Sequence, residues 1–294
     1  MKADARFSGL DPVFWANVRS ISETLRYTER PTKKIRVYSL GDMIHVMETL
    51  GLEWGHLADQ SGNITAFAEQ LQDYFEHRAE VLNTYVEPRL MDANRARNTF
   101  EQLRSQLSPK CPLPMNKQKG SMRAHNFLTC IVNMLVEAGI KGLPCDYDPR
   151  RLTTLTQAAK PARTLSRRLD GCFPKTVNPI AAWEIKEYYY TTTFGSRVAD
   201  GVYETLLDGY EIAEARESLG VDVQHLLIVD AYGTWWDLGR SYLCRIIDML
   251  HMGYVDEVLF GYETVERLPE IVEGWVAMYK SRTISNQQLF DIQG

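Results

Sequence analysis

The sequence predicts an α/β protein that begins with a mainly helical region. In the second half of the chain, short apolar runs rich in β-branched and aromatic residues alternate with longer stretches whose apolar residues recur every three or four positions. In about the first 110 residues, only the helical spacing is prominent. This order of elements favours a central mixed β-sheet flanked by helices.

Helices are expected to make up the N-terminal region. The helical spacing of apolar residues is clear in residues 43–50 and again in residues 64–107. Pro88 falls inside the second stretch. We expect it to break or restart the helix there, because proline has no backbone N–H to donate.

The second half is expected to form the α/β part of the protein. A proline-rich loop, residues 108–120, is the clearest change of composition and predicts a boundary, so we expect a helical region over residues 1–115 and an α/β domain over residues 116–294. From the apolar spacing we expect, in chain order, a helix over 121–137, a strand over 180–190, a helix over 196–219, a strand over 226–229, a helix over 238–250, a strand over 255–260 and a helix over 268–278.

The charge of the chain is unevenly distributed. The formal net charge is −5, which by itself argues against a protein that coats nucleic acid. Residues 110–175, however, hold twelve Lys and Arg against four Asp and Glu, so this segment carries +8 and the rest of the chain −13. A local basic surface can attract a polyanion even on an acidic protein. A solvated loop region with a chance excess of basic residues would give the same pattern.

Several classes of protein are disfavoured by features that the sequence lacks. No run approaches the roughly 20 apolar residues of a membrane span, and the N-terminus lacks the apolar segment of a secretory signal. The five cysteines are scattered without a CxxC pair, which is typical of a reducing cytosol and argues against a zinc cluster. The dinucleotide-binding, P-loop and α/β-hydrolase motifs are missing. We therefore expect a cytoplasmic protein with no membrane attachment.

Two acidic residues and a lysine form the pattern with the clearest chemistry. Glu184 and Lys186 lie on a predicted strand, where alternation puts both on one face, and the loop after Asp170 can bring that residue back beside Glu184. Two neighbouring carboxylates repel each other unless a cation lies between them, and Mg²⁺ prefers such oxygen ligands. A lysine on the same face would orient or deprotonate a water. Together these groups outline a site that hydrolyses phosphodiesters.

The spacing Asp-x13-Glu-Ile-Lys, at the ends of two predicted strands, resembles the motif of the PD-(D/E)XK nuclease superfamily. The resemblance covers about residues 120–262, and within the superfamily the chain is most similar to type II restriction endonucleases. It implies a restriction-endonuclease-like core. It also implies that Asp170 and Glu184 are metal ligands, that the Ile185 carbonyl adds a further ligand, and that Lys186 is the catalytic lysine.

Two positions bear on how closely the chain follows that family. Leu169 stands where the motif has proline, and Glu137 is the only acid on the predicted helix before the sheet, which makes it a weak candidate for an additional acid. The resemblance further implies Mg²⁺ as cofactor, with Mn²⁺ as a substitute, and double-stranded DNA cut to 5′-phosphate and 3′-hydroxyl ends. A type II enzyme would be a homodimer that reads a short palindromic site. Residues 1–115 would then dimerise the chain, contact DNA, or do both.

Basic residues near the motif are the candidates for contacts with DNA. The helix that follows the strand would offer phosphate-binding groups at the threonines 191–193, Ser196 and Arg197, although capping of that helix explains the hydroxyls equally well. The candidate DNA contacts are Lys117, Lys119, Arg123, Arg163, Arg167, Arg168 and Arg197.

Two alternatives remain open on the sequence alone. One is a related nuclease that acts in repair, in a phage or in defence against modified DNA. The other is a catalytically silent α/β protein that binds DNA or serves as a scaffold. In that case Glu184 and Lys186 would form only a surface ion pair.

Overall fold

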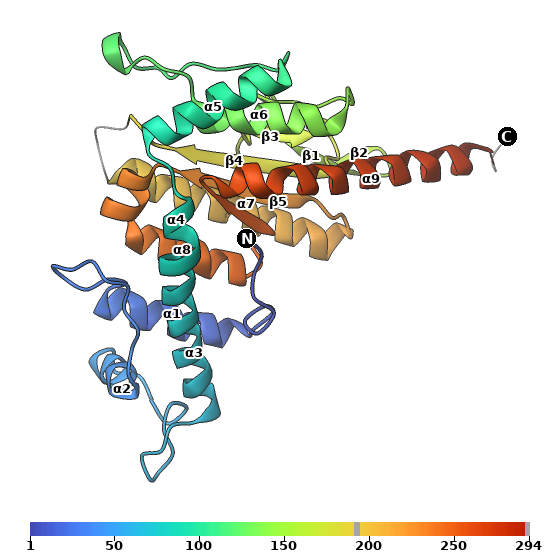
Figure 1. Ribbon diagram of the computed structural model, residues 1–294. Helices are drawn as coiled ribbons and strands as arrows, with labels where there is room; N and C mark the ends of the chain where they lie inside the picture. The colour runs from blue at the N-terminus through green and yellow to red at the C-terminus, as the bar shows by residue number, and fades with distance from the viewer. Residues whose placement is uncertain (191–194, 292–294) are drawn as a thin grey trace.

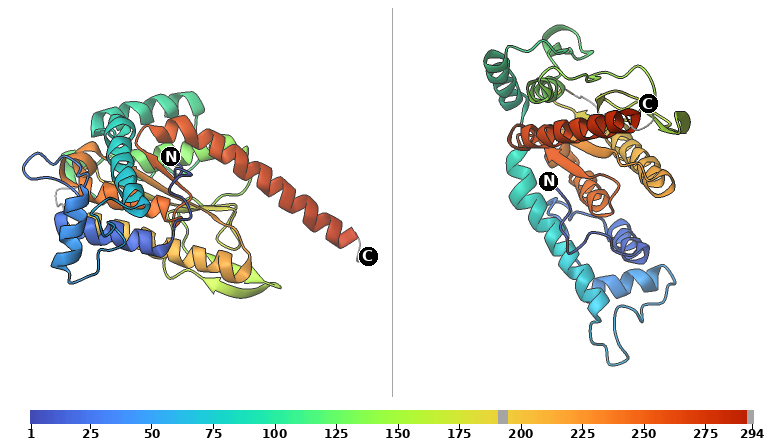
Figure 2. Two further views of the ribbon diagram at one scale, coloured as in Figure 1. Left: turned by 90° about the horizontal axis from the view of Figure 1, so that it is seen from below. Right: turned by 90° about the vertical axis from the view of Figure 1, so that its right-hand side faces the viewer.

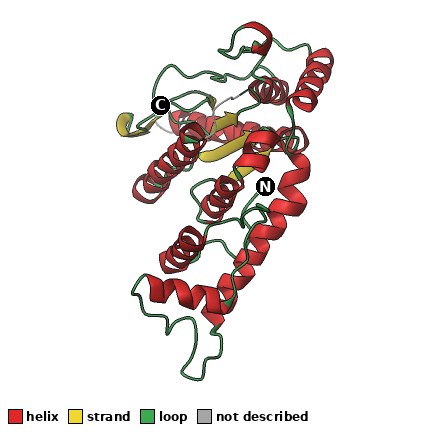
Figure 3. Ribbon diagram, turned by 90° about the vertical axis from the view of Figure 1, so that its left-hand side faces the viewer, coloured by secondary structure: helices red, strands yellow, loops and turns green. Residues whose placement is uncertain are grey.

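A four-stranded mixed β-sheet, packed between helices, organises the second half of the protein and confirms the α/β prediction (Figure 1; Figure 3). In the order β3–β4–β5–β6, β3 is antiparallel to β4 and the other neighbours are parallel. The strands are β3 (Gly171–Phe173), β4 (Ala181–Glu187), β5 (Gln224–Asp230) and β6 (Glu257–Phe260). The computed structural model describes residues 1–190 and 195–291, without the side chains of Ser121 and residues 283–291. The threonines 191–193 therefore lie outside the described residues.

Different helices cover the two faces of the sheet. On one face Trp183 and Leu226 pack with α5, α6 and α9, and on the other Leu227 and Val229 pack with α7 and α8, because alternate strand residues point to opposite sides. The end of α9 extends beyond the body of the protein (Figure 2). The bounds are α5 (Ala93–Leu107), α6 (Phe127–Ile140), α7 (Ser196–Leu219), the π-helical turn η3 (Gly233–Leu238), α8 (Arg240–His251) and α9 (Glu263–Asp291).

The N-terminal region forms a helical body with its own core, in which Trp15 and Tyr74 are buried. Its last helix continues toward the sheet, where Leu82 and Val86 join the cluster around α8. Just before Pro88 the α-helix is followed by a π-helical turn. Pro88 then lies in the first turn of a new helix, where its missing N–H is tolerated. The helices are α1 (Pro12–Leu25), α2 (Leu40–Thr49), α3 (Ala66–Val81), the π-helical turn η1 (Leu82–Val86) and α4 (Glu87–Arg89).

The helix expected from residue 121 begins only at Phe127. Asn116 closes the preceding residues into a loop, because its side-chain oxygen accepts hydrogen bonds from the N–H groups of Gln118 and Ala124, both at 3.2 Å. Apolar spacing could not reveal this loop, since it depends on one asparagine side chain.

Other elements also differ from the expected pattern. A hairpin of β1 (Thr154–Gln157) and β2 (Lys160–Thr164) forms where we expected no strand, and Gly120–Met122 forms the short 3-10 turn η2. Helix α5, on the N-terminal side of the expected boundary at residue 115, packs against α6 in the core beside the sheet. Among the described helices, none has both the length and the apolar character needed to cross a bilayer.

Arg78 of α3 and Asp248 of α8 form a buried ion pair between the N-terminal body and the α/β half. Arg78 Nη1 donates to Asp248 Oδ1 at 2.9 Å, and the hydroxyl of Tyr74 donates to the same oxygen at 2.6 Å. Arg78 Nη2 donates to the hydroxyl of Ser22 of α1. Loss of one partner would leave the other charge in an apolar core without compensation.

Replacing Arg78 by methionine is expected to lower the free energy of unfolding by about 3–5 kcal/mol, because Asp248 would lose its counter-charge. Arg150→Met is the matched control. Arg150 also pairs with an aspartate, Asp148, but both side chains are exposed, so its loss is expected to cost at most about 1 kcal/mol. Urea unfolding measures both changes, and equal effects would contradict the prediction.

Asp230, the last residue of β5, ties the segment after α4 to the sheet. Its Oδ1 accepts hydrogen bonds from the N–H groups of Met91 at 2.7 Å and Ala231 at 2.8 Å, and its Oδ2 accepts one from the hydroxyl of Tyr189. The carboxyl group is fully buried. This burial raises the pKa of Asp230 to about 7, against the hydrogen bonds that favour the ionised form.

Asp230 should make the protein less stable as the pH rises from about 4 to about 7, because the folded state holds its proton more tightly than the unfolded chain does. Asp230→Asn removes this effect and can keep all three hydrogen bonds, since its amide nitrogen can donate to Tyr189. Relative to the wild type, the variant should gain at least about 1 kcal/mol in urea unfolding between about pH 5 and pH 8. A stability difference that does not change with pH would disprove this.

Candidate active site

The hairpin of β3 and β4 brings Asp170 and Glu184 together. Gly171 pairs with Trp183 in antiparallel register, and the Asp170 N–H donates to the Trp183 carbonyl at 3.1 Å, so Asp170 lies opposite Glu184. Position 171 requires glycine, because a Cβ there would lie 2.1 Å from the Trp183 ring. The Asp170 carboxylate accepts a hydrogen bond from the Ile185 N–H at 2.8 Å.

Glu184 and Lys186 point from β4 toward α7, while Trp183 points to the opposite face. Both charged side chains are buried, with residue exposures of 0% for Glu184 and 8% for Lys186. Lys186 Nζ donates to Glu184 Oε2 at 2.9 Å and to Glu204 Oε2 at 3.0 Å. Gly201 of α7 leaves room for two side chains that follow one another on this face, since a Cβ there would lie 2.8 Å from the Tyr188 hydroxyl and 3.3 Å from Lys186 Cδ. The pair therefore lies in the interior and is not a surface ion pair.

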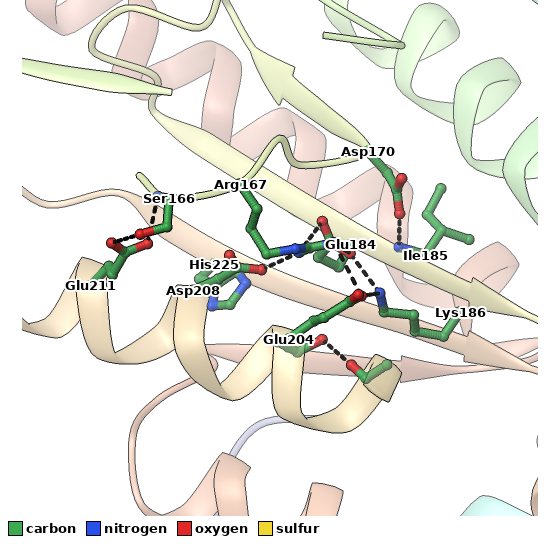
Figure 4. A network of polar contacts seen from close by, with 12 residues as sticks. Ser166, Arg167, Asp170, Glu184, Ile185, Lys186, Glu204, Asp208, Glu211 and His225 are labelled. Atoms are coloured by element: carbon green, nitrogen blue, oxygen red, sulfur yellow. Dashed lines mark hydrogen bonds and ion pairs between the residues drawn. The ribbon is translucent and has the colours of Figure 1, made fainter. Parts of the chain in front are cut away.

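Arg167, one of the expected DNA contacts, points into the same cluster of acids (Figure 4). Its Nη1 lies 2.9 Å from Glu184 Oε1 and 2.5 Å from Asp208 Oδ2, and its Nη2 lies 3.2 Å from Glu204 Oε2. Glu204 and Asp208 are one turn apart on α7, so both reach toward β4. We did not predict these two acids. Their four-residue spacing on an amphipathic helix is the signal that marks them in the sequence.

The crowding of acids changes the protonation of the cluster. Burial and the charge of Glu184 raise the pKa of Asp170 to about 6, although its carboxylate is open to solvent on one side. Burial, opposed by Arg167, raises the pKa of Asp208 to about 7. Burial alone would lower the pKa of Lys186, but the surrounding carboxylates, first that of Glu184, raise it above its usual value. The lysine is therefore a cation and a hydrogen-bond donor.

Acids outnumber bases in this cluster. Its members are Asp170, Glu184, Glu204, Asp208, Arg167 and Lys186. With every group ionised, four carboxylates and two cations leave a net charge of −2, which one divalent cation would neutralise. Oδ1 of Asp208 is also buried without a hydrogen-bond donor, and Oε1 of Glu184 makes no hydrogen bond, although Nη1 of Arg167 lies 2.9 Å from it as an ion pair. The cluster is therefore suited to a further cation.

A cation at this site would have few side-chain ligands. Among the described residues, no three His, Cys, Asp or Glu side chains converge as ligands of one metal ion. The N–H and C=O of one strand residue point to the same edge of the strand, so the Ile185 carbonyl lies on the edge where its N–H meets Asp170. The carboxylates of Asp170 and Glu184, this carbonyl and water make an oxygen set that fits Mg²⁺.

The cluster lies in an open cavity of about 680 Å³. Tyr188, Tyr189 and Tyr190, which follow β4, also line this cavity. Lys117, from the loop closed by Asn116, and Arg197, from the first turn of α7, add positive charge to the lining. The structure thus brings two of the seven expected DNA contacts, Lys117 and Arg197, to the acidic cluster in exposed positions.

Arg167, a third expected DNA contact, also lines the cavity but is paired with acids there, and the remaining four lie outside it. Lys119, Arg123 and Arg168 are exposed. Arg163 is paired with α7, where its Nη1 lies 2.5 Å from Glu214 Oε2. These positions leave Lys119, Arg123 and Arg168 accessible to a large ligand, whereas Arg163 already has an acidic partner.

Two further acids contact the ends of α6. Glu137, near the C-terminal end, accepts a hydrogen bond from the Lys110 N–H at 2.9 Å, so the structure does not bring this expected acid to the cluster. Glu187 of β4 accepts hydrogen bonds from the N–H and the hydroxyl of Thr129, at 2.7 and 3.0 Å, and thereby caps the N-terminal end. Burial raises the pKa of Glu187 to about 8, against these two bonds.

Comparison with known proteins identifies families but not an activity. Residues 1–85 match a family described as a domain of unknown function, DUF7690, and residues 91–275 match a second one, DUF7687. The two matched segments meet within η1 and α4, where the helical body joins the sheet. No curated protein and no solved structure matches the chain. Because the second match covers more than half of the chain, the protein belongs to the DUF7687 family.

Proposed function

We propose that this protein is a Mg²⁺-dependent DNA endonuclease, with Mn²⁺ as a substitute, and that it acts as a type II restriction enzyme. One observation carries the proposal: Asp170 and Glu184 lie opposite each other beside a protonated Lys186, in a cavity open to solvent. A protein that needed only a stable core would gain little from such buried charges, which apolar side chains often replace without loss. The hairpin, α7 and parallel β5 also follow the order on which the resemblance to PD-(D/E)XK nucleases rests.

Each residue of the cluster has a role in the proposed reaction. Asp170, Glu184 and the Ile185 carbonyl would hold Mg²⁺, which supplies positive charge to the phosphate oxygens when bound. Lys186 would donate a hydrogen bond to the attacking water or to a phosphate oxygen. Its raised pKa favours this role over removal of a proton from the water. The oxygen of the water would form a bond to phosphorus while the bond from phosphorus to the 3′ oxygen breaks. The water would lose its proton to solvent and the 3′ oxygen would take one up, which leaves 5′-phosphate and 3′-hydroxyl ends.

Double-stranded DNA is the proposed substrate. Lys117 and Arg197 are placed to contact backbone phosphates next to the acidic cluster, and contacts of this kind position DNA without reading its sequence. A homodimer, a palindromic recognition site and a cytoplasmic location remain predictions. A neighbouring gene for a DNA methyltransferase would favour restriction over repair, phage or other defence roles.

The first test is cleavage of DNA by point variants. Glu184→Gln and Lys186→Met are each expected to slow Mg²⁺-dependent cleavage of plasmid DNA at least about 100-fold. The first removes the negative charge of a proposed metal ligand, and the second removes the positive charge of the lysine next to the reacting phosphate. Glu266→Gln is the matched control. Glu266 is a partly exposed acid that pairs with Arg89 far along the chain from the cluster, so its removal should leave cleavage unchanged.

The outcomes of this test distinguish a wrong function from a wrong assignment of the site residues. If the wild type cuts neither DNA nor RNA of any modification state with Mg²⁺ or Mn²⁺, the protein is not a nuclease, and the silent binding protein becomes the better explanation. If it cuts and both variants cut as fast, the assignment of Glu184 and Lys186 is wrong. Cleavage of RNA alone would change the substrate and keep the chemistry.

DNA binding tests the lining of the cavity separately from the chemistry. With Ca²⁺ in place of Mg²⁺, Lys117→Gln should weaken DNA binding and reduce the salt dependence of log K by about 0.9, the contribution of one phosphate contact. Lys141→Gln is the control, since Lys141 is exposed at the opposite end of α6. Equal salt dependence in the two variants would show that Lys117 does not contact phosphate.

A further inference from the structure

Arg167 occupies the oxygen of Glu184 that a metal ion would need (Figure 4). Lys186 donates to Oε2 of this carboxylate at 2.9 Å, and Nη1 of Arg167 lies 2.9 Å from Oε1. Both oxygens of the buried carboxylate thus face a cation that belongs to the chain itself. A divalent ion that coordinates Glu184 therefore has to share an oxygen with one of these two side chains or displace it.

Besides Glu184, Arg167 contacts two acids of α7, whereas Lys186 contacts one, Glu204. Arg167 Nη1 lies 2.5 Å from Asp208 Oδ2 and its Nη2 lies 3.2 Å from Glu204 Oε2, both on α7. The arginine side chain is 24% exposed, whereas that of Lys186 is 10% exposed and packed beside Gly201. Asp208 also has a second oxygen, Oδ1, that is buried and has no hydrogen-bond donor. The guanidinium can therefore leave Glu184 and remain bound to α7.

We propose that Arg167 competes with the metal ion for Glu184, and that Asp208 receives the guanidinium when the ion binds. This inference rests on the proposed metal site and adds regulation to it. Lys186 already holds Oε2, so a metal ion would bind at Oε1, where it and the guanidinium would repel each other and compete for one oxygen. In the metal-free protein Arg167 neutralises Glu184, and this ion pair lowers the affinity for the metal. Asp208 is a positioning residue, since it acts through Arg167.

Binding of Mn²⁺ in the absence of DNA, followed by the electron paramagnetic resonance signal of the free ion, tests this exchange. Arg167→Met removes the competing charge and keeps the aliphatic stem, so the dissociation constant for Mn²⁺ should fall at least about fivefold. Asp208→Asn should raise it at least about threefold, because the guanidinium loses its second anchor and stays on Glu184. In the Arg167→Met background, Asp208→Asn should have a clearly smaller effect.

Arg163→Met is the matched control for the change of charge. Arg163 also comes from the segment before β3, pairs with an acid of α7, Glu214, and has a side-chain exposure of 28%. Its removal leaves Glu184 untouched and should change the Mn²⁺ affinity less than about twofold. Thermal unfolding confirms that each variant is folded.

Three results would overturn the exchange. They are absence of Mn²⁺ binding in every variant, unchanged or weaker binding by Arg167→Met, and equal effects of Asp208→Asn in the two backgrounds. Cleavage of DNA by the same proteins is the separate measurement. If Mn²⁺ binding follows the prediction but no DNA is cut, the exchange stands and the proposed function falls. If DNA is cut while Mn²⁺ affinity is independent of Arg167, the nuclease stands and the exchange falls.

Discussion

The buried carboxylate of Glu184 is the constraint on which the α/β half of the protein depends. An ionised carboxylate inside a protein is costly unless charges and hydrogen bonds compensate for it. Glu184 is fully buried, so the fold supplies cations from its own chain: Lys186 from the same strand and Arg167 from the segment before β3. Position 201 on α7 is glycine, which gives the lysine room to lie against the helix. The ion pairs around Glu184 thus link β4, the segment before β3 and α7, in addition to the apolar packing between the sheet and its helices.

The same requirement holds the N-terminal body in place. Arg78 and Asp248 are both buried, and their ion pair joins α3 to α8. In the same way, the ion pair of Arg167 and Glu184 joins the segment before β3 to β4. Because α8 and α7 cover the same face of the sheet, the helical body is anchored to the layer that carries the acidic cluster.

The sequence predicted the features that depend on local spacing. Alternation along β4 placed Glu184 and Lys186 on one face, and the helical spacing located α7 correctly. It could not predict contacts between distant segments. The basic run before Asp170 shows that the region is positively charged, but it does not show that Arg167 turns inward to acids on a helix that follows later in the chain. The start of α6 was missed for the same kind of reason, because the side chain of Asn116 decides it.

The excess of acids distinguishes a cation site from an ion network that only supports a fold. A supporting network has no reason to carry more charge of one sign, since every uncompensated buried charge destabilises the folded state. This cluster has two more acids than bases, and the excess is offset by solvent at Asp170 and Glu204, by Lys117 and Arg197 in the cavity lining, by protons or by a bound cation. With pKa values of about 6 for Asp170 and about 7 for Asp208, protons leave these acids near neutral pH. Above that pH the cluster gains negative charge, so the proposed affinity for a divalent cation should rise with pH, and this expectation does not depend on the resemblance to any family.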